Sequence, residues 1–324
     1  MPPAKHRVPR KTPPRPHPTT PPEVVDPIWL AKALGLSLLA ALLCAWLTLC
    51  LLFYQGEWQL VLNPSRRVDS TPANVGLDFQ LVRFDAAETG QPRLTGWWIP
   101  AEAGSQLSFQ TPPKYAALTV LYLHDGSQSL SATVPALARL HQAGLNIFAI
   151  DYRGFGQSDA SAHPTEARMA QDTAAALDYL TATRHVPTAN IVPYGVGLGA
   201  SLAAALAVKH PEIPAVILDN PDPDPTATAV ESHPSGVIPV RLIFRERFEI
   251  AAPLANLPTP KLLIAGGPNA AQGADEIRAL QMLFRNAHSP SLSVTLPPTR
   301  YEVAYQTALS RFLDQYAASS ILTR

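Results

Sequence analysis

Short hydrophobic runs alternate with longer amphipathic stretches along most of the chain after residue 76. Six of the runs have the length and composition of strands that are buried on both faces of a parallel sheet: 117–123, 146–150, 191–194, 215–218, 261–265 and 291–296. The intervening and final stretches have the spacing of helices: 129–143, 165–183, 198–210, 274–287 and 301–318. Because strand and helix alternate, the pattern predicts an α/β fold, a doubly wound and mostly parallel sheet with helices on both faces.

Three further segments depart from this alternation. Residues 77–84 and 94–99 alternate apolar with polar side chains, which predicts two half-exposed antiparallel strands ahead of the parallel sheet. Residues 221–258 are rich in proline at first and amphipathic later. Their place in the strand and helix order predicts a lid or pocket wall over the carboxyl ends of the strands.

The most apolar part of the chain precedes this domain and runs without a charged residue from Ala33 to Tyr54. It is long enough to span a bilayer, and Trp29, Tyr54 and Trp58 are placed as interfacial aromatic residues. A cleaved signal peptide would have a shorter apolar region and a small-residue cleavage site, neither of which is visible. The sequence therefore predicts an uncleaved transmembrane helix at 28–54.

The segment at 1–27 is different in kind, because it is rich in proline and contains almost nothing that could form a core. Its basic residues are Lys5, Arg7, Arg10, Lys11 and Arg15. This composition predicts a disordered basic tail, with residues 55–324 forming one globular domain. By the positive-inside rule the tail stays in the cytoplasm, so the domain is expected on the extracytoplasmic side, in a bacterial periplasm.

Charge and cysteine usage narrow the classes of partner. The net charge of the chain is zero, so there is no electrostatic case for nucleic acid. Both cysteines, Cys44 and Cys50, lie within the apolar segment, which leaves the globular part without a disulfide or a thiol nucleophile. No His/Cys grouping with metal-ligand spacing occurs, so we expect no metal and no other cofactor. The expected partner is the membrane.

A glycine-rich turn stands between the apolar run at 191–194 and the alanine-rich helix that follows it: Gly195-Val196-Gly197-Leu198-Gly199. Strand, sharp turn and helix are the context of the G-x-S-x-G nucleophile elbow, whose middle serine stands exposed at the carboxyl end of the sheet. Here the middle residue is Gly197, and a hydrogen in that place cannot attack a carbonyl.

The globular part resembles the membrane-anchored, serine-aminopeptidase-like branch of the α/β-hydrolases. The resemblance is carried by GWWIP at 96–100, VLYLHDG at 120–126, FAIDYRGFGQSD at 148–159, PTEARMAQDTAAALDYL at 164–180, PVRLIFRERF at 239–248 and PTPKLLIAGG at 258–267. It implies an α/β-hydrolase fold and indicates where a catalytic triad would lie.

The resemblance places the acid of the triad at Asn269 and the base in the loop at 297–301, which ends in Tyr301. No histidine follows His288, so the base position lacks its imidazole. At the oxyanion turn the family's His-Gly becomes His124-Asp125. The predicted pocket and oxyanion-like residues are His124, Asp125, Gly126, Gly197 and Leu198. A carboxylate at this turn works against acyl chemistry.

Loss of nucleophile, acid and base together predicts a pseudoenzyme that binds a lipid, an acyl chain or a partner protein near the membrane. The alternative is an atypical esterase, thioesterase or acyl-lipid hydrolase that uses water, Ser201 or a recruited aspartate. The candidate aspartates follow the run at 215–218: Asp219, Asp222 and Asp224. The simpler interpretation is that Ser201 packs its helix against the sheet and that the aspartates form a solvated loop.

Other polar residues are expected to have structural roles. His124 is predicted to be a structural histidine at the end of a strand. Asp151 and Arg153 of the DYRGFG motif are predicted to form a buried ion pair that holds their loop. A mixed-sign stretch is predicted to form a solvated helical face: Arg241, Arg245, Glu246, Arg247 and Glu249.

Overall fold

The computed structural model describes residues 26–85, 92–101, 113–161, 163–232, 236–267 and 274–318. The chain divides into two compact units, Met1–Leu51 and Leu52–Arg324. The first unit holds most of helix α1 (Pro27–Gly56), which is long and apolar enough to cross a membrane. The predicted tail at 1–27 lies outside the described residues except for its last two, and Asn269 lies outside them as well.

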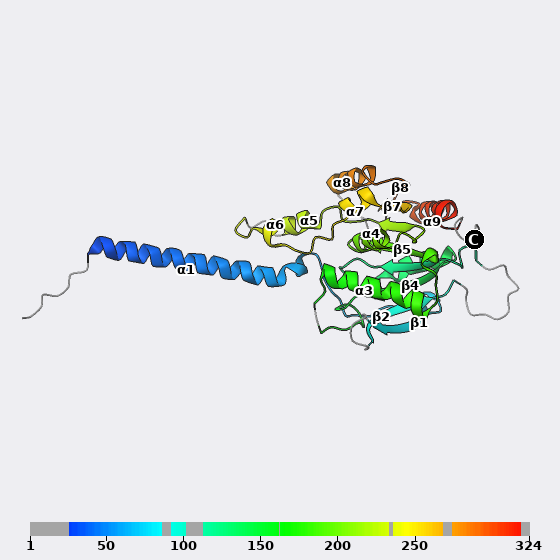
Figure 1. The fold of residues 1–324 in the computed structure, drawn as a ribbon, viewed down its shortest axis with the longest axis horizontal. Helices are drawn as coiled ribbons and strands as arrows, with labels where there is room; N and C mark the ends of the chain where they lie inside the picture. The colour runs from blue at the N-terminus through cyan, green and yellow to red at the C-terminus, as the bar shows by residue number, and fades with distance from the viewer. Residues whose placement is uncertain are drawn as a thin grey trace, which may run out of the picture. The chain divides into compact units, whose positions relative to one another are not determined.

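The second unit is built on an eight-stranded sheet in the order β1-β2-β4-β3-β5-β6-β7-β8 (Figure 1). The strands are β1 (Gln80–Asp85), β2 (Pro92–Ile99), β3 (Thr119–Leu123), β4 (Asn146–Asp151), β5 (Ile191–Val196), β6 (Val216–Asp219), β7 (Lys261–Gly266) and β8 (Ser291–Leu296). Strand β2 is antiparallel to both of its neighbours, whereas β3 to β8 are all parallel. The predicted α/β-hydrolase architecture, with two early antiparallel strands, is confirmed.

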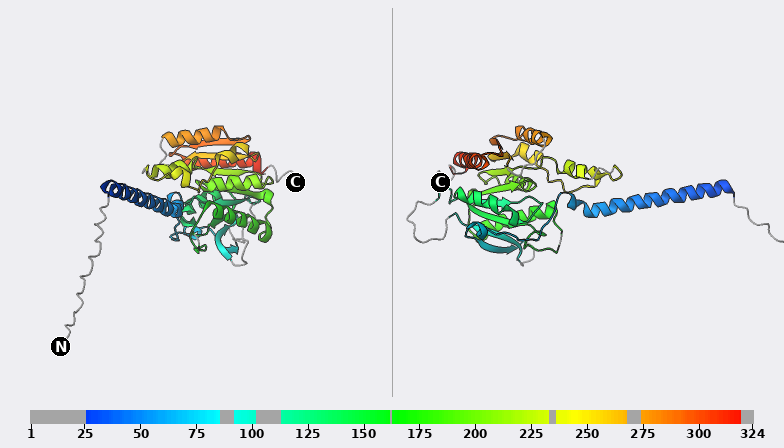
Figure 2. Two further views of the ribbon diagram at one scale, coloured as in Figure 1. Left: turned by 60° about the vertical axis from the view of Figure 1, so that its left-hand side comes forward. Right: turned by 180° about the vertical axis from the view of Figure 1, so that it is seen from behind.

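Helices cover both faces of this sheet. They are α2 (Val134–Gln142), α3 (Glu166–Asp178), α4 (Gly199–Lys209), α5 (Pro225–Ser232), α6 (Val240–Ile243), α7 (Ala251–Asn256), α8 (Ala274–Arg285) and α9 (Tyr301–Phe312). One core cluster joins one face of the sheet to α3, α4, α7 and α8, and a second joins the other face to α2 and α9. Figure 2 shows this arrangement from two further sides. Because β3 is buried along its whole length, its continuous apolar run is the pattern expected of a central parallel strand.

Glycines bring the start of α4 against the sheet. A Cβ at Gly195 would lie 2.2 Å from the carbonyl oxygen of Gly199, and one at Gly199 would lie 2.3 Å from that of Leu123. Neither position tolerates a side chain, so the two glycines permit the backbone of α4 to approach β5 and β3 closely. This packing places the turn at Gly197 at the carboxyl end of the sheet.

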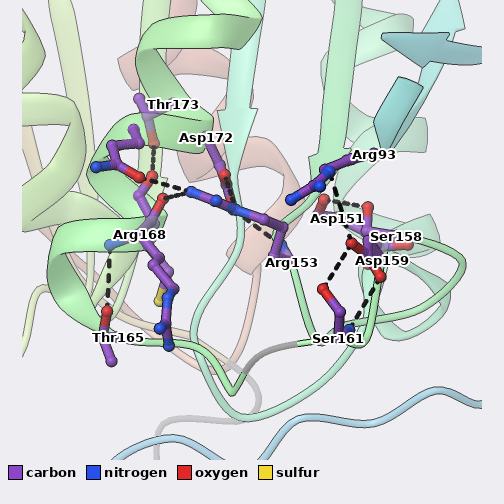
Figure 3. A network of polar contacts seen from close by, with 12 residues as sticks. Arg93, Asp151, Arg153, Ser158, Asp159, Ser161, Thr165, Arg168, Asp172 and Thr173 are labelled. Atoms are coloured by element: carbon purple, nitrogen blue, oxygen red, sulfur yellow. Dashed lines mark hydrogen bonds and ion pairs between the residues drawn. The ribbon is translucent and has the colours of Figure 1, made fainter. Parts of the chain in front are cut away.

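The loop after β4 is held by a buried ion pair, but its partner differs from the predicted one (Figure 3). Arg153 Nε lies 2.6 Å from Oδ1 of Asp172 in α3, and the Arg153 backbone N–H donates to Asp172 Oδ2. Asp151 accepts instead from the backbone N–H of Leu130 at 2.9 Å. Figure 3 shows Arg153 directed toward Asp172 and away from Asp151. The predicted pair of Asp151 with Arg153 is therefore wrong, because α3 supplies the carboxylate.

The mixed-sign stretch of the insertion is not a helical face. Helix α6 ends at Ile243, and the residues after it up to Ile250 are not helical. Arg245 Nε lies 2.5 Å from Oε1 of Glu57, whose side chain is buried, and the buried Glu246 accepts from the backbone N–H of Glu166. The prediction of a helical face is therefore wrong after Ile243, and that of solvated charges is wrong for Glu246, whose side chain is buried; Arg241, Arg245, Arg247 and Glu249 are exposed.

Candidate functional site

The turn after β5 keeps the backbone of a nucleophile elbow. Gly197 has a φ of +55°, in the left-handed region, and its N–H donates to the carbonyl oxygen of Asp219 at 3.0 Å. The elbow of an α/β-hydrolase holds its serine in such a strained turn. Glycine adopts this conformation without the steric strain that a Cβ would bring.

The side chain of Asp125 fills the space above this turn. A Cβ built on Gly197 would lie 2.6 Å from Asp125 Oδ1 and 2.8 Å from its Cγ. The backbone N–H of Leu198 donates to the same Oδ1 at 3.3 Å, and the hydroxyl of Ser127 donates to Oδ2 at 2.8 Å. In an active hydrolase the N–H after the nucleophile is an oxyanion donor. The Asp125 carboxylate thus fills the space that a nucleophile's side chain would take, and it accepts from the N–H that would bind an oxyanion.

His124, the residue before Asp125, is buried, and its ring contacts a backbone carbonyl and lies near a second aspartate. Its Nδ1 lies 2.7 Å from the carbonyl oxygen of Asp125, so Nδ1 carries the proton and donates. Its Nε2 has no hydrogen-bond partner among the described residues and lies 3.8 Å from Oδ1 of Asp151. Burial lowers the pKa of His124 to about 4, so the ring is neutral at pH 7. Burial also raises the pKa of Asp151 to about 6.

Tyr301, where the resemblance places the base, is the first residue of α9. Its ring is buried and lies 5.3 Å from the guanidinium carbon of Arg139. Burial raises the pKa of Tyr301 to about 12, so its hydroxyl keeps its proton at neutral pH. The carbonyl of His288, the last histidine of the chain, accepts from the ammonium of Lys261 at the start of β7. His288 therefore lies at the amino ends of the parallel strands, whereas the elbow lies at their carboxyl ends, so His288 cannot serve as its base.

Asp219, the last residue of β6, lines the cavity beside the elbow. It accepts from the hydroxyl of Tyr194 at 2.6 Å and from the side-chain amide of Asn220 at 2.9 Å. Burial raises the pKa of its carboxyl group. The prediction of a solvated aspartate is wrong for Asp219, because β6 extends to it. Asp222 and Asp224 do lie in the following loop, where Asp224 accepts from the N–H of Ala227 at the start of α5.

Ser201 is not directed at the space above Gly197. Its side chain is buried, and its hydroxyl donates to the carbonyl oxygen of Leu198 at 2.7 Å. Gly126 packs beneath Leu62 and its carbonyl accepts from the N–H of Asn63. Of the five residues predicted for the pocket, three line the cavity described next: His124, Asp125 and Gly197. Leu198 contributes only its backbone N–H, and Gly126 is not part of the lining.

A cavity of about 670 Å³ lies over the carboxyl ends of β3, β5, β6 and β7, and we call it the elbow cavity. Its described lining contains three carboxylic acids and one arginine: Asp125, Asp219, Glu276 and Arg139. The arginine also pairs with Glu302 at 3.7 Å and lies over the ring of Tyr305. Among the described residues no group of three His, Cys, Asp or Glu side chains is arranged to hold a metal ion.

Sequence reasoning missed part of this cavity. Tyr122 lies next to the end of β3 and contributes to the lining, a place that strand order alone indicates. Arg139 comes from the middle of α2, and no motif marks it. None of the described residues of 221–258 lines the cavity, so the lid assignment stays a prediction.

Comparison with known proteins gives a consistent family. A family model described as serine aminopeptidase, S33, matches residues 115–294. The uncharacterized protein Rv2307c of Mycobacterium tuberculosis is 31% identical over 175 residues, which are 54% of this chain and 57% of that protein. The uncharacterized protein YfhR of Salmonella typhimurium is 27% identical over 68% of this chain and 77% of its own length. The chain thus spans little more than half the length of the first of these relatives.

Solved structures share the fold at low sequence identity. The esterase Pf2001 of Pyrococcus furiosus has a TM-score of 0.57 with 19% identity, over 79% of this chain and 98% of its own. An alpha-beta hydrolase from Vibrio vulnificus has a TM-score of 0.54 with 21% identity, over 76% of this chain and 81% of its own. These likenesses show the architecture of the domain.

Proposed function

Because the chain belongs to the serine aminopeptidase S33 family of the α/β-hydrolases and carries a carboxylate where the nucleophile of such an enzyme would stand, we propose that it is a non-hydrolytic, ligand-binding member of that family. The observation that carries this proposal is the Asp125 side chain, which fills the space above Gly197 and accepts from the N–H of Leu198. A substrate carbonyl would have to displace it to reach the elbow.

The chemistry of acyl transfer supports the same proposal. The reaction needs a nucleophile, a base within hydrogen-bond reach of it, and donors for the oxyanion. Gly197 supplies no nucleophile, and the proton acceptor of His124 faces Asp151. The backbone N–H of Leu198, which would have to bind an oxyanion, already donates to the negatively charged Asp125 carboxylate.

The lining of the elbow cavity favours a small polar ligand with a positive charge. Asp125, Asp219 and Glu276 bring acidic groups, and the guanidinium of Arg139 is engaged by Glu302 and by tyrosine rings. An acyl chain would leave these polar groups without water or a partner, which is unfavourable. A lipid and an acyl chain are the competing ligands that the binding experiment includes.

A covalent-labelling experiment tests the loss of hydrolysis. The full chain in detergent is treated with a fluorophosphonate probe and with short-chain nitrophenyl esters, and the esterase from Pyrococcus furiosus serves as positive control. We expect neither labelling nor turnover above buffer. Labelling of the wild-type chain at any serine, with turnover that follows it, would overturn the proposal.

A thermal-shift experiment tests binding. Spermidine, choline, a short-chain fatty acid and a detergent-solubilised lipid are compared as probes on the full chain and on Asp219→Asn. We expect the cations to raise the melting temperature of the wild type more than that of the variant. Stabilisation by the fatty acid alone would contradict the charge argument.

An atypical hydrolase is the second candidate, favoured by the same carboxylate at the nucleophile position. In that reaction an Asp125 oxygen attacks the ester carbonyl and the alkoxide leaves with a proton from water, which forms a mixed anhydride. A second water then attacks Cγ of Asp125 and releases the substrate acid, so one oxygen of the regenerated carboxylate comes from water. A single turnover in ¹⁸O-labelled water would then place the label in Asp125. Turnover that Asp125→Asn abolishes, with label at this residue, would establish this candidate over the first.

We also propose that α1 anchors the chain in a membrane, with the basic tail in the cytoplasm and the domain outside it. Protease added to spheroplasts is then expected to digest the domain without detergent. Digestion only in inside-out vesicles would reverse the orientation.

A further inference from the structure

An exposed apolar and basic surface lies on the insertion around α6. Leu242 has 83% of its surface exposed and Val237 has 58%. Arg241 and Arg247 lie in the same segment of the insertion, are exposed, and form no ion pair with any residue in the described ranges. We call these four residues the α6 surface. Figure 1 shows α5 and α6 together, projecting from the body of the domain.

The segment that carries this surface is fixed to residues 53–61. Phe53, Leu60 and Val61 pack against a small core that contains Val240 and Phe244. This contact joins the buried residues of the α6 segment to the end of α1 and the turn after it. The packing of Val240 and Phe244 therefore holds the segment that carries the α6 surface.

Polar contacts reinforce the same junction. The guanidinium carbon of Arg245 lies 4.0 Å from the centre of the Tyr54 ring, and its Nη1 donates to the Tyr54 hydroxyl at 2.8 Å. Its backbone N–H and its Nε both donate to the carboxylate of Glu57, which is buried. A buried carboxylate with several donors is costly to separate from them, which holds this junction together.

The position of Tyr54 in a membrane sets the level of the α6 surface. An aromatic residue at the end of a transmembrane helix lies in the headgroup region. Arg245 contacts Tyr54 directly, so the α6 segment is held next to that region if α1 crosses the bilayer. Exposed leucine and valine with flanking arginines are the side chains that an interfacial segment uses, apolar groups for the acyl boundary and cations for anionic headgroups.

We propose that the α6 surface is a second membrane contact, which inserts Leu242 and Val237 at the bilayer interface and places Arg241 and Arg247 against anionic lipid headgroups. This inference rests on the proposed membrane span of α1 and is independent of what the elbow cavity binds. Val303 on α9 is an exposed apolar side chain outside the insertion and serves as the comparison.

Fluorescent labels at single cysteines test this contact in the full chain. Three chains are prepared: Cys50→Ala, which leaves Cys44 as a reporter of the span; Leu242→Cys in a Cys44→Ala, Cys50→Ala background; and Val303→Cys in that background as the matched exposed control. Each is labelled with an environment-sensitive dye and reconstituted into phosphatidylcholine vesicles with phosphatidylglycerol. Quenching by spin-labelled lipid and by aqueous iodide is then measured.

We expect the label at 242 to be quenched severalfold more by spin-labelled lipid than the label at 303, and to be protected from iodide. Arg241→Gln with Arg247→Gln should reduce this difference, as should omission of phosphatidylglycerol. Equal quenching at 242 and 303, with Cys44 quenched by lipid, would overturn the α6 contact while leaving the span intact. If Cys44 is not quenched either, the span and the contact both fail, and the cavity proposal is unaffected.

Discussion

Two polar regions lie at the carboxyl ends of strands in one sheet, and they differ in what they keep of the family's sequence. The loop after β4, residues 151–159, keeps its arginine paired with Asp172 and its Ser158 hydroxyl donating to the Asp151 carbonyl. The turn after β5 keeps its backbone but lacks a nucleophile and a free oxyanion donor. The first region therefore stabilises the fold through a buried ion pair, whereas the second keeps its backbone conformation without a side chain at residue 197.

The largest effect is expected where the loop after β4 is broken. The Arg153 side chain is only 14% exposed, and Asp172→Ala removes its carboxylate partner in α3. Removing one partner of a buried pair costs about 3–5 kcal/mol in free energy of unfolding. Thermal unfolding of the detergent-solubilised chain measures it, with the exposed Asp178→Ala on the same helix as control. Equal losses in the two variants would remove the distinction between the regions.

His124 and Asp151 join the two regions, and their proton equilibria oppose each other. Folding lowers the pKa of His124 from 6.5 to about 4, so its contribution to stability is lost as the pH falls through that window. Folding raises the pKa of Asp151 from 3.8 to about 6, so its contribution is full at low pH and is lost as the pH rises through 6.

Single substitutions should separate these opposing terms. As the pH is lowered from 6.5 to 4, the free energy of unfolding of His124→Gln should rise relative to that of wild type, and that of Asp151→Asn should fall relative to it. Each difference should reach up to about 3 kcal/mol. Denaturant unfolding at a series of pH values measures both slopes. Parallel pH profiles for all three proteins would show that the pair does not titrate as described.

A smaller effect is expected at the elbow. Gly197→Ser places a side chain on a left-handed backbone and displaces Asp125, which should cost about 1–3 kcal/mol. Adding Asp125→Gly should recover part of that loss, because it clears the space. Neither protein should hydrolyse nitrophenyl esters, since no imidazole in the described part of the chain is placed to take a proton from residue 197. Substantial esterase activity in either one would show that a base has been overlooked.

The smallest effect is expected for Tyr301→Phe. The ring that packs against Arg139 stays, and only the hydroxyl is lost, which should cost less than about 1 kcal/mol. Nitrophenyl ester turnover should stay at background. A change in turnover, or a much larger drop in melting temperature, would give this residue a role beyond packing.

The strands were predictable because a central parallel strand needs apolar side chains on both faces. For β3 the observed Thr119–Leu123 falls inside the predicted 117–123. The insertion resisted prediction, since it consists of the short helices α5, α6 and α7 separated by non-helical residues, and no single period extends through it. Periodicity therefore gave the layers of the domain and missed the contacts of the insertion with residues 53–61.

The candidate site was predictable only where its residues are contiguous in the sequence. Gly197 was found because the elbow is defined by a strand before it and a helix after it. The partner of Arg153 was missed because nearby carboxylates in sequence compete with Asp172, which α3 brings from 19 positions away. The occupation of the elbow by Asp125 depends on a side-chain conformation, which spacing does not give.

The contact between Asp125 and the turn at Gly197 also limits how these two positions can change during evolution. A side chain at 197 and a carboxylate at 125 compete for one volume, so neither position varies freely while the other is fixed. Substitutions that regain a nucleophile would first pass through a crowded intermediate or need position 125 to become small beforehand. Among descendants of this chain, residues 125 and 197 are therefore expected to change in that order and as a pair.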